Sequence, residues 1–431
     1  MAAPAPLPLL HQVTCPHCWK TFRPEEILWV AAHIDLIGDP RLGPDQPQRF
    51  LPSRFNLEGQ ALDARGFPCQ SLACPECHLT VPRTLLEMEP LFLSILGTPA
   101  CGKSYYLAAL TWQLRKVLPQ FALSFTDVEP LINQSLTDNE EALFLNPRGN
   151  GYQLLASLIG KTKLQGEMYD TVSFGTQSVL YPRPYLFGLH PMQRHYQADQ
   201  PHARPAPRVM CLYDNAGEHF QPGRETTAAP VTQHLARAEL LLYLFDPTQD
   251  PRFRSWMGNG QADERSSRQE MILLEAAARI RRTLGLAANA KHDRPLIVVL
   301  TKCDAWRQKM TNSDWSDPWK SNSECFGLDA ERVEQRSDQI RTLLRKYCPD
   351  LVHAAEGFAS EVMYVPVSAL GHTPRQMADG IYVRPGDIKP IWVTIPILYG
   401  LYRWLHRMIR SLKRSAPSPV IATPHRPGQP V

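Results

Sequence analysis

The sequence predicts an α/β protein with a mostly parallel sheet, helices on both faces of that sheet, and a small module before it. Between residues 89 and 412, short unbroken apolar runs alternate with amphipathic helical patterns. Such runs are typical of parallel strands that helices cover on both sides. Residues 1–88 instead carry two closely spaced cysteine pairs, and residues 413–431 are rich in proline without periodicity. We expect this last segment to be a disordered tail.

Length and composition place the chain among globular proteins. Of its 431 residues, 43% are hydrophobic and 20% are charged, which excludes a largely disordered chain. A net charge of +4 does not by itself indicate nucleic acid or membrane as a partner. The 10 cysteines are too sparse for a disulfide-rich secreted domain. The N-terminus has no signal-peptide pattern, and no apolar run approaches the roughly 20 residues of a spanning helix, so we expect a cytoplasmic protein.

The elements of the second region follow from its apolar pattern. Five runs are predicted to be strands, with Tyr185–Leu189 as a weaker sixth. The five are Leu91–Leu96, Arg208–Asp214, Glu239–Asp246, Pro295–Thr301 and Val362–Val367. Predicted helices are Ser104–Leu118, Ser266–Leu284, Asp329–Cys348 and Pro396–Leu412. Short strands alternating with longer helices predict crossover connections, and therefore a parallel sheet.

An eight-residue segment after the first predicted strand has the pattern G-x4-G-K-S. It consists of Gly97, Thr98, Pro99, Ala100, Cys101, Gly102, Lys103 and Ser104. Backbone N–H groups of such a loop surround phosphates, and glycine avoids collisions there. We expect Lys103 to neutralise the β- and γ-phosphates and the Ser104 hydroxyl to bind Mg²⁺. The strand before the loop and the amphipathic helix after it favour this function over a chance glycine-rich turn.

A second segment with phosphate chemistry follows the strand Arg208–Asp214. Asp214-Asn215-Ala216-Gly217 has the form D-x-x-G. We expect Asp214 to hold Mg²⁺ through water and the Gly217 N–H to contact the γ-phosphate. Alone, D-x-x-G at a strand end is a common turn. Its position after a phosphate-binding loop favours function.

Two further strand ends resemble the guanine-reading elements of GTPases, [NT]-K-x-D and S-A-[LK]. The residues expected there are Thr301, Lys302, Asp304, Ser368, Ala369 and Leu370. The carboxylate of Asp304 can accept hydrogen bonds from guanine N1–H and the N2 amino group, a donor pair that adenine lacks. Lys302 would lie along the base, and Thr301 stands where asparagine is commoner. The backbone of the S-A-L segment would contact the guanine oxygen.

In this order and at strand ends, the four segments resemble the translation-factor and Ras-like class of P-loop GTPases, of the TRAFAC type. The resemblance implies GTP or GDP and Mg²⁺ as ligands at the carboxyl edge of the sheet. It also implies a threonine ligand for Mg²⁺ in a first switch segment. The long separation of the first two segments predicts an insertion around that switch, at about 121–207. Thr162 is the candidate ligand there, and Thr171 and Thr176 are alternatives.

One position departs from the Ras-type pattern. Where those enzymes usually have a glutamine that orients the attacking water, this chain has Glu218, followed by His219. Glu218 is the candidate for positioning water, but its charge would sit close to the γ-phosphate. We therefore expect hydrolysis to be slow unless a partner supplies a cation. Arg224 and Arg237 are alternative internal cations, although ordinary solvated arginines explain them better.

Two C-P-x-C pairs dominate the first region. They are Cys15, Cys18, Cys74 and Cys77. Four thiolates at this local spacing suit a closed, structural Zn²⁺ site of the zinc-ribbon kind. The pairs lie farther apart than the about 15–20 residues of common ribbons, so a long insert must loop out. A redox C-x-x-C is the alternative, but it would need a thioredoxin-like βαβ unit that the sequence lacks.

Together these features resemble the zinc-ribbon-bearing members of the bacterial double-GTPase families, which are predicted to act in conflict or defence systems. The resemblance implies a Mg²⁺-dependent molecular switch that docks a protein partner, either another GTPase or an effector, through its zinc module and switch segments. Nucleic acid remains open as a ligand of the zinc module. A P-loop ATPase, or a nucleotide-gated scaffold without turnover, is the alternative function.

Overall fold

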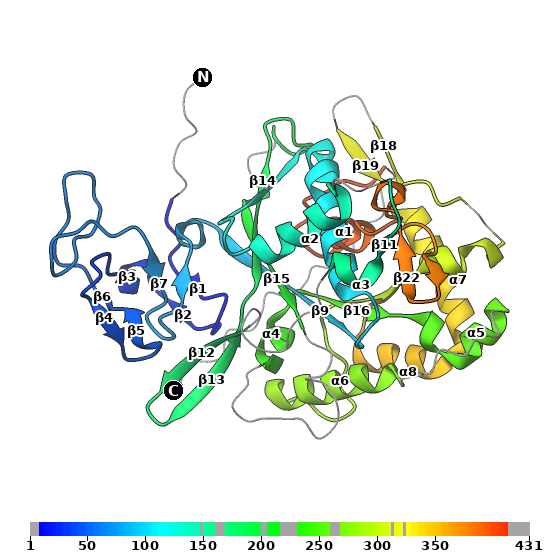
Figure 1. The fold of residues 1–431 in the computed structure, drawn as a ribbon, viewed down its shortest axis with the longest axis horizontal. Coiled ribbons are helices and arrows are strands. Elements are labelled where there is room, and N and C mark those ends of the chain that lie inside the picture. Colours follow the sequence, from blue (N-terminus) through cyan, green and yellow to red (C-terminus); the bar gives the residue numbers. More distant parts are fainter. Residues whose placement is uncertain are drawn as a thin grey trace.

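The centre of the molecule is a seven-stranded mixed sheet with the order β10-β14-β15-β9-β16-β17-β20 (Figure 1). The computed structural model describes residues 8–146, 150–159, 169–199, 205–215, 231–258, 268–311, 314–321 and 325–412. In sheet order, the strands are Leu123–Asp127, Tyr185–Pro191, Arg208–Asp214, Glu89–Gly97, Leu240–Phe245, Leu296–Leu300 and Val362–Pro366. The five strands from β15 to β20 run parallel, and β14 and β10 extend one edge in antiparallel pairs. The predicted α/β class is confirmed.

Both faces of the sheet are buried, which explains the unbroken apolar runs. In β16, Leu240, Leu242 and Leu244 pack into one apolar core, whereas Leu241 and Tyr243 pack into the other. Helix α1 lies over the first core, and α6 and α8 lie over the second (Figure 1). The helices are α1 Lys103–Val117, α2 Gln134–Phe144, α3 Leu155–Leu158, α4 Val231–Arg237, α5 Pro251–Met257, α6 Glu270–Leu284, α7 Ala330–Tyr347, α8 Pro349–Phe358 and α9 Ile395–Arg403.

Local signals set several helix ends where the sequence predicts them. Helix α7 begins after Asp329, whose side chain accepts the N–H of Arg332, as an N-cap should. Helix α6 ends at Gly285, which takes a left-handed φ of 65° that glycine adopts at little cost. Its predicted start was too early, because the helix begins at Glu270.

The predicted helix Pro396–Leu412 is wrong beyond its first half. Helix α9 ends at Arg403, and His406 and Arg407 adopt left-handed φ angles of 56° and 50° that break the helical path. The chain instead turns back beside β19, where Leu328 N–H bonds to Arg410 O at 3.0 Å and Leu412 N–H bonds to Leu328 O at 2.9 Å. This path keeps the apolar side chains after residue 404 in the core without helical spacing.

The smaller strands surround this sheet. In the N-terminal part they are β1 Val13–Thr14, β2 Thr21–Phe22, β3 Leu28–Val30, β4 Ile37–Asp39, β5 Gly43–Pro47, β6 Arg49–Phe50, β7 Leu72–Ala73 and β8 Thr80–Val81. The others are β11 Gln153–Leu154, β12 Tyr169–Phe174, β13 Gln177–Pro182, β18 Trp319–Ser321, β19 Phe326–Leu328, β21 Arg375–Met377 and β22 Gly380–Val383. The β12–β13 hairpin projects beside the N-terminal module (Figure 1). Within the described ranges, no helix is long and apolar enough to cross a bilayer.

Candidate functional site

Four cysteine side chains meet in the N-terminal module. The Sγ atoms of Cys15, Cys18, Cys74 and Cys77 lie within 4.8 Å of one another, and all four side chains are buried. The Cys15 and Cys77 sulfurs are 3.8 Å apart, and those of Cys18 and Cys74 are 3.7 Å apart. Metal–sulfur bonds of about 2.3 Å in a tetrahedron place the sulfurs about 3.8 Å apart. The predicted four-cysteine cluster is confirmed, and it could hold a metal ion.

Each cysteine pair occupies a tight turn between two short strands, β1 and β2 for the first pair and β7 and β8 for the second. In each turn, the sulfur of the first cysteine accepts a 3.4 Å hydrogen bond from a backbone N–H, that of His17 or that of Glu76. The residues after the pairs, Trp19 and His78, both take left-handed φ angles, 57° and 62°. The two turns therefore present their sulfurs in matching geometry.

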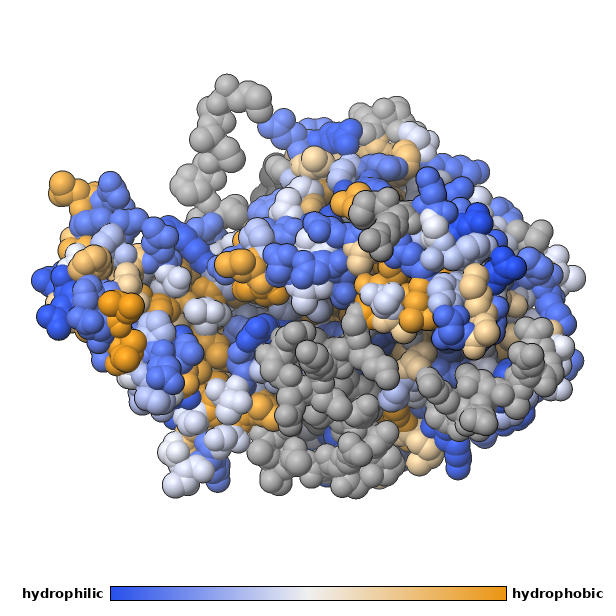
Figure 2. All heavy atoms as spheres, viewed as in Figure 1, coloured by the Kyte–Doolittle hydropathy of each residue, from blue (hydrophilic) through white to orange (hydrophobic). Residues whose placement is uncertain are grey.

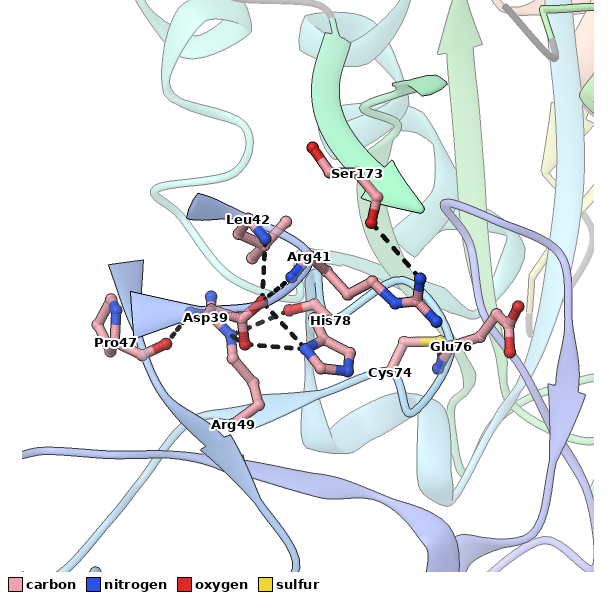
Figure 3. Close-up of polar contacts among 9 residues, drawn as sticks. All are labelled: Asp39, Arg41, Leu42, Pro47, Arg49, Cys74, Glu76, His78 and Ser173. Atoms are coloured by element: carbon pink, nitrogen blue, oxygen red, sulfur yellow. Dashed lines mark hydrogen bonds and ion pairs between the residues drawn. The ribbon is translucent and has the colours of Figure 1, made fainter. Parts of the chain in front are cut away.

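A buried carboxylate ties the insert between the cysteine pairs to the second turn (Figure 3). Asp39 contacts His78 Nδ1 at 2.8 Å and accepts the N–H of Arg41 at 2.9 Å. Although burial acts in the opposite direction, these hydrogen bonds lower the pKa of Asp39. The guanidinium of Arg41 reaches the carbonyl oxygen of Ser173 in β12 at 3.5 Å, so the insert also contacts the β12–β13 hairpin.

The candidate phosphate-binding loop joins β9 to α1. A Cβ atom on Gly97 would lie 2.8 Å from Cys101 Sγ and 2.9 Å from the backbone oxygen of Leu244, so the first glycine cannot be replaced without movement. Gly102 takes a φ of 92° directly before α1 begins at Lys103, a conformation that favours glycine. The Lys103 ammonium donates to the Gly97 oxygen at 3.4 Å. Its side chain therefore folds over the loop.

Cys101 is fully buried in this loop. Burial raises the pKa of its thiol, although Lys103 acts in the opposite direction. Burial in the loop therefore disfavours the thiolate form of Cys101.

Thr98 in the same loop is held by a residue far along the chain. Its hydroxyl donates to Gln269 Oε1 at 3.0 Å, which also accepts the N–H of Asp246 at 3.0 Å. The Gln269 amide in turn donates to the Asp246 carbonyl at 2.7 Å. This buried side chain therefore joins the loop to the end of β16.

Asp214 ends β15, the strand beside β9, and its side chain is buried with 5% of the residue exposed. Its Oδ1 atom has no hydrogen-bond partner among the described residues. Burial raises the pKa of Asp214, while the charge of Lys103 lowers it. A buried carboxylate with an unpaired oxygen beside a lysine fits a Mg²⁺ ion or its bound water. The next residue, Asn215, is anchored by its side chain to Ser94 Oγ and Ile95 O, both at 3.0 Å.

Lys302 connects the candidate base-reading segment to the phosphate-binding loop. It follows β17 in a left-handed conformation with φ of 55°. Its ammonium lies 2.5 Å from the buried carboxylate of Asp246 and donates to the carbonyl oxygen of Ala100 at 3.5 Å. Thr301 donates its hydroxyl to Phe245 O at 3.3 Å. Hydrogen bonds and an ion pair therefore connect the ends of β16 and β17 to the loop.

The carboxylate of Asp304 is held from the segment after β20. Ser368 donates its hydroxyl to Asp304 Oδ1 at 2.5 Å, and Thr373 donates to Oδ2 at 3.2 Å. Ser368 Oγ also accepts the N–H of Gly371 at 2.7 Å. The S-A-L and T-K-x-D segments, 64 residues apart at Ser368 and Asp304, are therefore in direct contact.

Some predicted residues lie outside the described part of the chain. They are Thr162, Gly217 and Glu218. His219 and Arg224 lie there too. The alternatives Thr171 and Thr176 are exposed on the β12–β13 hairpin. Because the roles of all these residues are untested, they stay predictions.

Two residues of the site were missed from sequence. Asp246 had a usable signal in the sequence. It ends the apolar run ELLLYLFD, just as Asp214 ends the apolar run RVMCLYD. Gln269 had none, because its contacts with Thr98 and Asp246 exist only in the folded chain.

Comparisons with known proteins give one relative over nearly the whole chain. No protein-family model matches. A protein of Mycolicibacterium smegmatis named "Putative ESX-1 scaffolding and assembly protein SaeC" is 24% identical over 425 residues, which covers 91% of this chain and 97% of that protein. This identity indicates a distant relative.

Solved GTPase structures also resemble the chain loosely. A Sup35–GDP complex has a TM-score of 0.21 with 14% identity, covering 65% of this chain and 38% of that one. The GTP-bound GTPase-like domain of S. cerevisiae Ski7 has a TM-score of 0.28 with 13% identity, covering 74% and 50%. The chain thus spans half or less of these neighbours. Since such TM-scores do not establish a shared fold, we assign the candidate site from this chain's own residues.

Proposed function

We propose that this chain binds GTP and GDP with Mg²⁺ at the carboxyl edge of its parallel strands and acts as a slow GTPase switch. The observation that carries the proposal is the contact between segments that are distant in sequence. Lys302 reaches Ala100 in the phosphate-binding loop, and Ser368 holds the carboxylate of Asp304. A loop that only happened to match G-x4-G-K-S would not require the contact with Lys302 after β17, or the hydrogen bond that ties the segment after β17 to the segment after β20.

In the proposed mechanism each residue has one physical task. Backbone N–H groups of the loop Gly97–Ser104, except at Pro99, surround the β- and γ-phosphates, and Lys103 neutralises their charge. The Ser104 hydroxyl and Asp214, together with Thr162, would hold Mg²⁺, which would supply positive charge beside the phosphates. Glu218 positions water, and Gly217 contacts the γ-phosphate. Because a carboxylate near the γ-phosphate repels it, turnover without a partner is slow.

The base is read by a second set of groups in the same proposal. Asp304 accepts two hydrogen bonds from guanine, Lys302 lies along the ring, and the segment Ser368–Leu370 contacts the guanine oxygen. Thr301 supports this segment from the end of β17. In this proposal Asp214 acts through Mg²⁺ at the phosphate end of the nucleotide, and Asp304 recognises the base at the other end.

We further propose that the four cysteines hold a structural Zn²⁺ ion. The support is the spacing of 3.7 and 3.8 Å between sulfurs, which fits tetrahedral thiolate ligation. Four thiolates complete a tetrahedral shell and leave no ligand position open for catalysis. The proposed domain boundaries follow: 1–88 for this module, 89–412 for the GTPase domain, and 413–431 for a tail.

A protein partner fits the surface of this module. Apolar side chains are exposed over it (Figure 2), and the largest exposed fractions are those of Ile34 at 83% and Leu57 at 108%. In this proposal, these exposed apolar side chains are available to a protein partner. The second candidate function is a scaffold whose assembly is controlled by nucleotide binding. It is supported by the relative from M. smegmatis, which is named as a putative scaffolding and assembly protein. A double-GTPase partner and a cytoplasmic location stay predictions of the sequence.

Thermal shifts and single-turnover hydrolysis test these proposals. Saturating GTP with Mg²⁺ is expected to raise the melting temperature more than ATP does, and Ser104→Ala should remove the Mg²⁺-dependent part. Slow release of phosphate from GTP would support the switch. GTP binding with no phosphate release over many hours would favour the scaffold. Equal shifts with ATP and GTP would refute guanine recognition.

A further inference from the structure

Strand β15 lies between the candidate nucleotide site and the four-cysteine cluster. Successive side chains of a strand point to opposite faces. Val209 and Tyr213 pack into the apolar cluster that contains all four cysteines, whereas Met210 and Leu212 pack into the core beneath α1. Tyr213 is followed directly by Asp214, the last residue of the strand. The strand that carries the candidate Mg²⁺ ligand is therefore also a wall of the cysteine module.

The Tyr213 hydroxyl group binds the first cysteine turn both as a hydrogen-bond donor and as an acceptor. It donates to the carbonyl oxygen of Pro16 at 2.5 Å and accepts from Trp19 Nε1 at 3.1 Å. Tyr213 is 0% exposed and Trp19 is 1% exposed. The Trp19 ring also packs against Tyr181 of β13 and His234 of α4, with centroids 6.2 and 6.0 Å away. One side chain of the cysteine turn thus contacts three elements of the sheet domain.

A second path returns from these rings to the end of β15. His234 stacks on Tyr213, with ring centroids 5.0 Å apart and planes at 12°. Its Nδ1 lies 3.0 Å from Ser94 Oγ, which also accepts the side-chain N–H of Asn215 at 3.0 Å. Asn215 follows Asp214 directly. The residues on both sides of Asp214 are therefore linked to the cysteine module, Tyr213 directly and Asn215 through Ser94 and His234.

We propose that Tyr213 is a positioning residue that couples the two sites. Metal bound by the four cysteines fixes the turn that holds the Tyr213 hydroxyl, and Tyr213 in turn fixes the backbone that aims Asp214. This inference rests on the proposed nucleotide function and adds its regulation. Since coupling between two binding sites is reciprocal, Mg²⁺ and GTP must also raise the affinity of the cysteine cluster for its metal.

The test of the residue is Tyr213→Phe, which keeps the ring and removes only the hydroxyl. The matched control is Tyr399→Phe, because Tyr399 is 2% exposed and its hydroxyl donates to Glu334 of α7 at 2.7 Å, a residue of neither site. We expect Tyr213→Phe to weaken binding of a fluorescent GTP analogue about fivefold or more and to raise the Mg²⁺ concentration required, with metal content unchanged. Tyr399→Phe should do neither.

The reciprocal measurement needs no variant and covers the case in which Tyr213→Phe fails to fold. The zinc affinity of the full-length wild-type chain is measured by chelator competition, with and without GTP and Mg²⁺. Coupling is supported if GTP and Mg²⁺ raise the zinc affinity by the same factor by which zinc raises the GTP affinity. Identical zinc affinities with and without GTP and Mg²⁺ overturn it. If the wild-type chain binds no GTP in any condition, the proposed function itself fails. If it binds GTP with the same affinity in zinc-loaded and zinc-free protein, only this inference fails.

Discussion

Replacement of Asp304 by asparagine tests how the base is recognised. Each oxygen of the Asp304 carboxylate accepts one hydrogen bond within the protein, from Ser368 at 2.5 Å or from Thr373 at 3.2 Å. A carboxylate oxygen offers about two acceptor positions, so each retains one for a donor of guanine. Asp304→Asn turns one of these acceptors into a donor that faces the N2 amino group.

The expected loss follows from two charge-assisted hydrogen bonds. At about 1.5–3 kcal/mol each, and with incomplete additivity, GTP should bind roughly 10²–10³-fold more weakly. Xanthosine triphosphate has an oxygen where guanine has the amino group, so its affinity should rise in the same variant. Calorimetric titration of both nucleotides measures the exchange. A variant that folds like wild type and keeps its preference for GTP over ATP would refute the reading of guanine by Asp304.

Three further changes have defined outcomes. Gly97→Ala places a Cβ 2.9 Å from the Leu244 oxygen. We expect the unfolding free energy, measured by denaturant titration, to fall by about 1–3 kcal/mol and nucleotide binding to weaken. An unchanged nucleotide affinity would show that the loop does not hold phosphate. Burial lowers the pKa of His234 to about 3, so below about pH 6.5 only the unfolded chain gains this proton. Unfolding free energy should therefore fall by about 2 kcal/mol from pH 7.5 to 5, and His234→Asn should reduce that slope; an equal slope would contradict it. Cys77→Ser should abolish bound zinc, as measured by elemental analysis. Cys69 is a buried cysteine outside the cluster, so Cys69→Ser should retain the zinc. Zinc retained in both variants would exclude the four-cysteine site.

The central strands could be predicted because they are covered on both faces. The strand Arg208–Asp214 was predicted with the bounds that the structure has, since every residue from Val209 to Asp214 is buried. The D-x-x-G and phosphate-loop segments were found for a related reason. Strand ends in a parallel sheet collect polar residues at one edge, and each segment follows such an end.

Contacts between distant parts of the chain could not be predicted. The hydrogen bond from Trp19 to Tyr213 spans 194 residues, and nothing in either local pattern requires it. The helix predicted to reach Leu412 failed for the same reason, because a backbone pairing with Leu328 outweighs helical periodicity after Arg403. By contrast, the β12–β13 hairpin has a local signal in the sequence, the glycine at position 175. In the structure Gly175 has a φ of 65° and lies in the two-residue turn between the strands.

We propose above all that this edge of the sheet binds a guanine nucleotide through Lys103 and Asp304. The most direct test is calorimetric titration of the zinc-loaded, full-length chain with GTP and with ATP in the presence of Mg²⁺. Both titrations are repeated with Lys103→Ala. We predict tight binding of GTP, far weaker binding of ATP, and loss of GTP binding in the variant. Binding of ATP as tight as that of GTP, or GTP binding unaffected by Lys103→Ala, would contradict the claim.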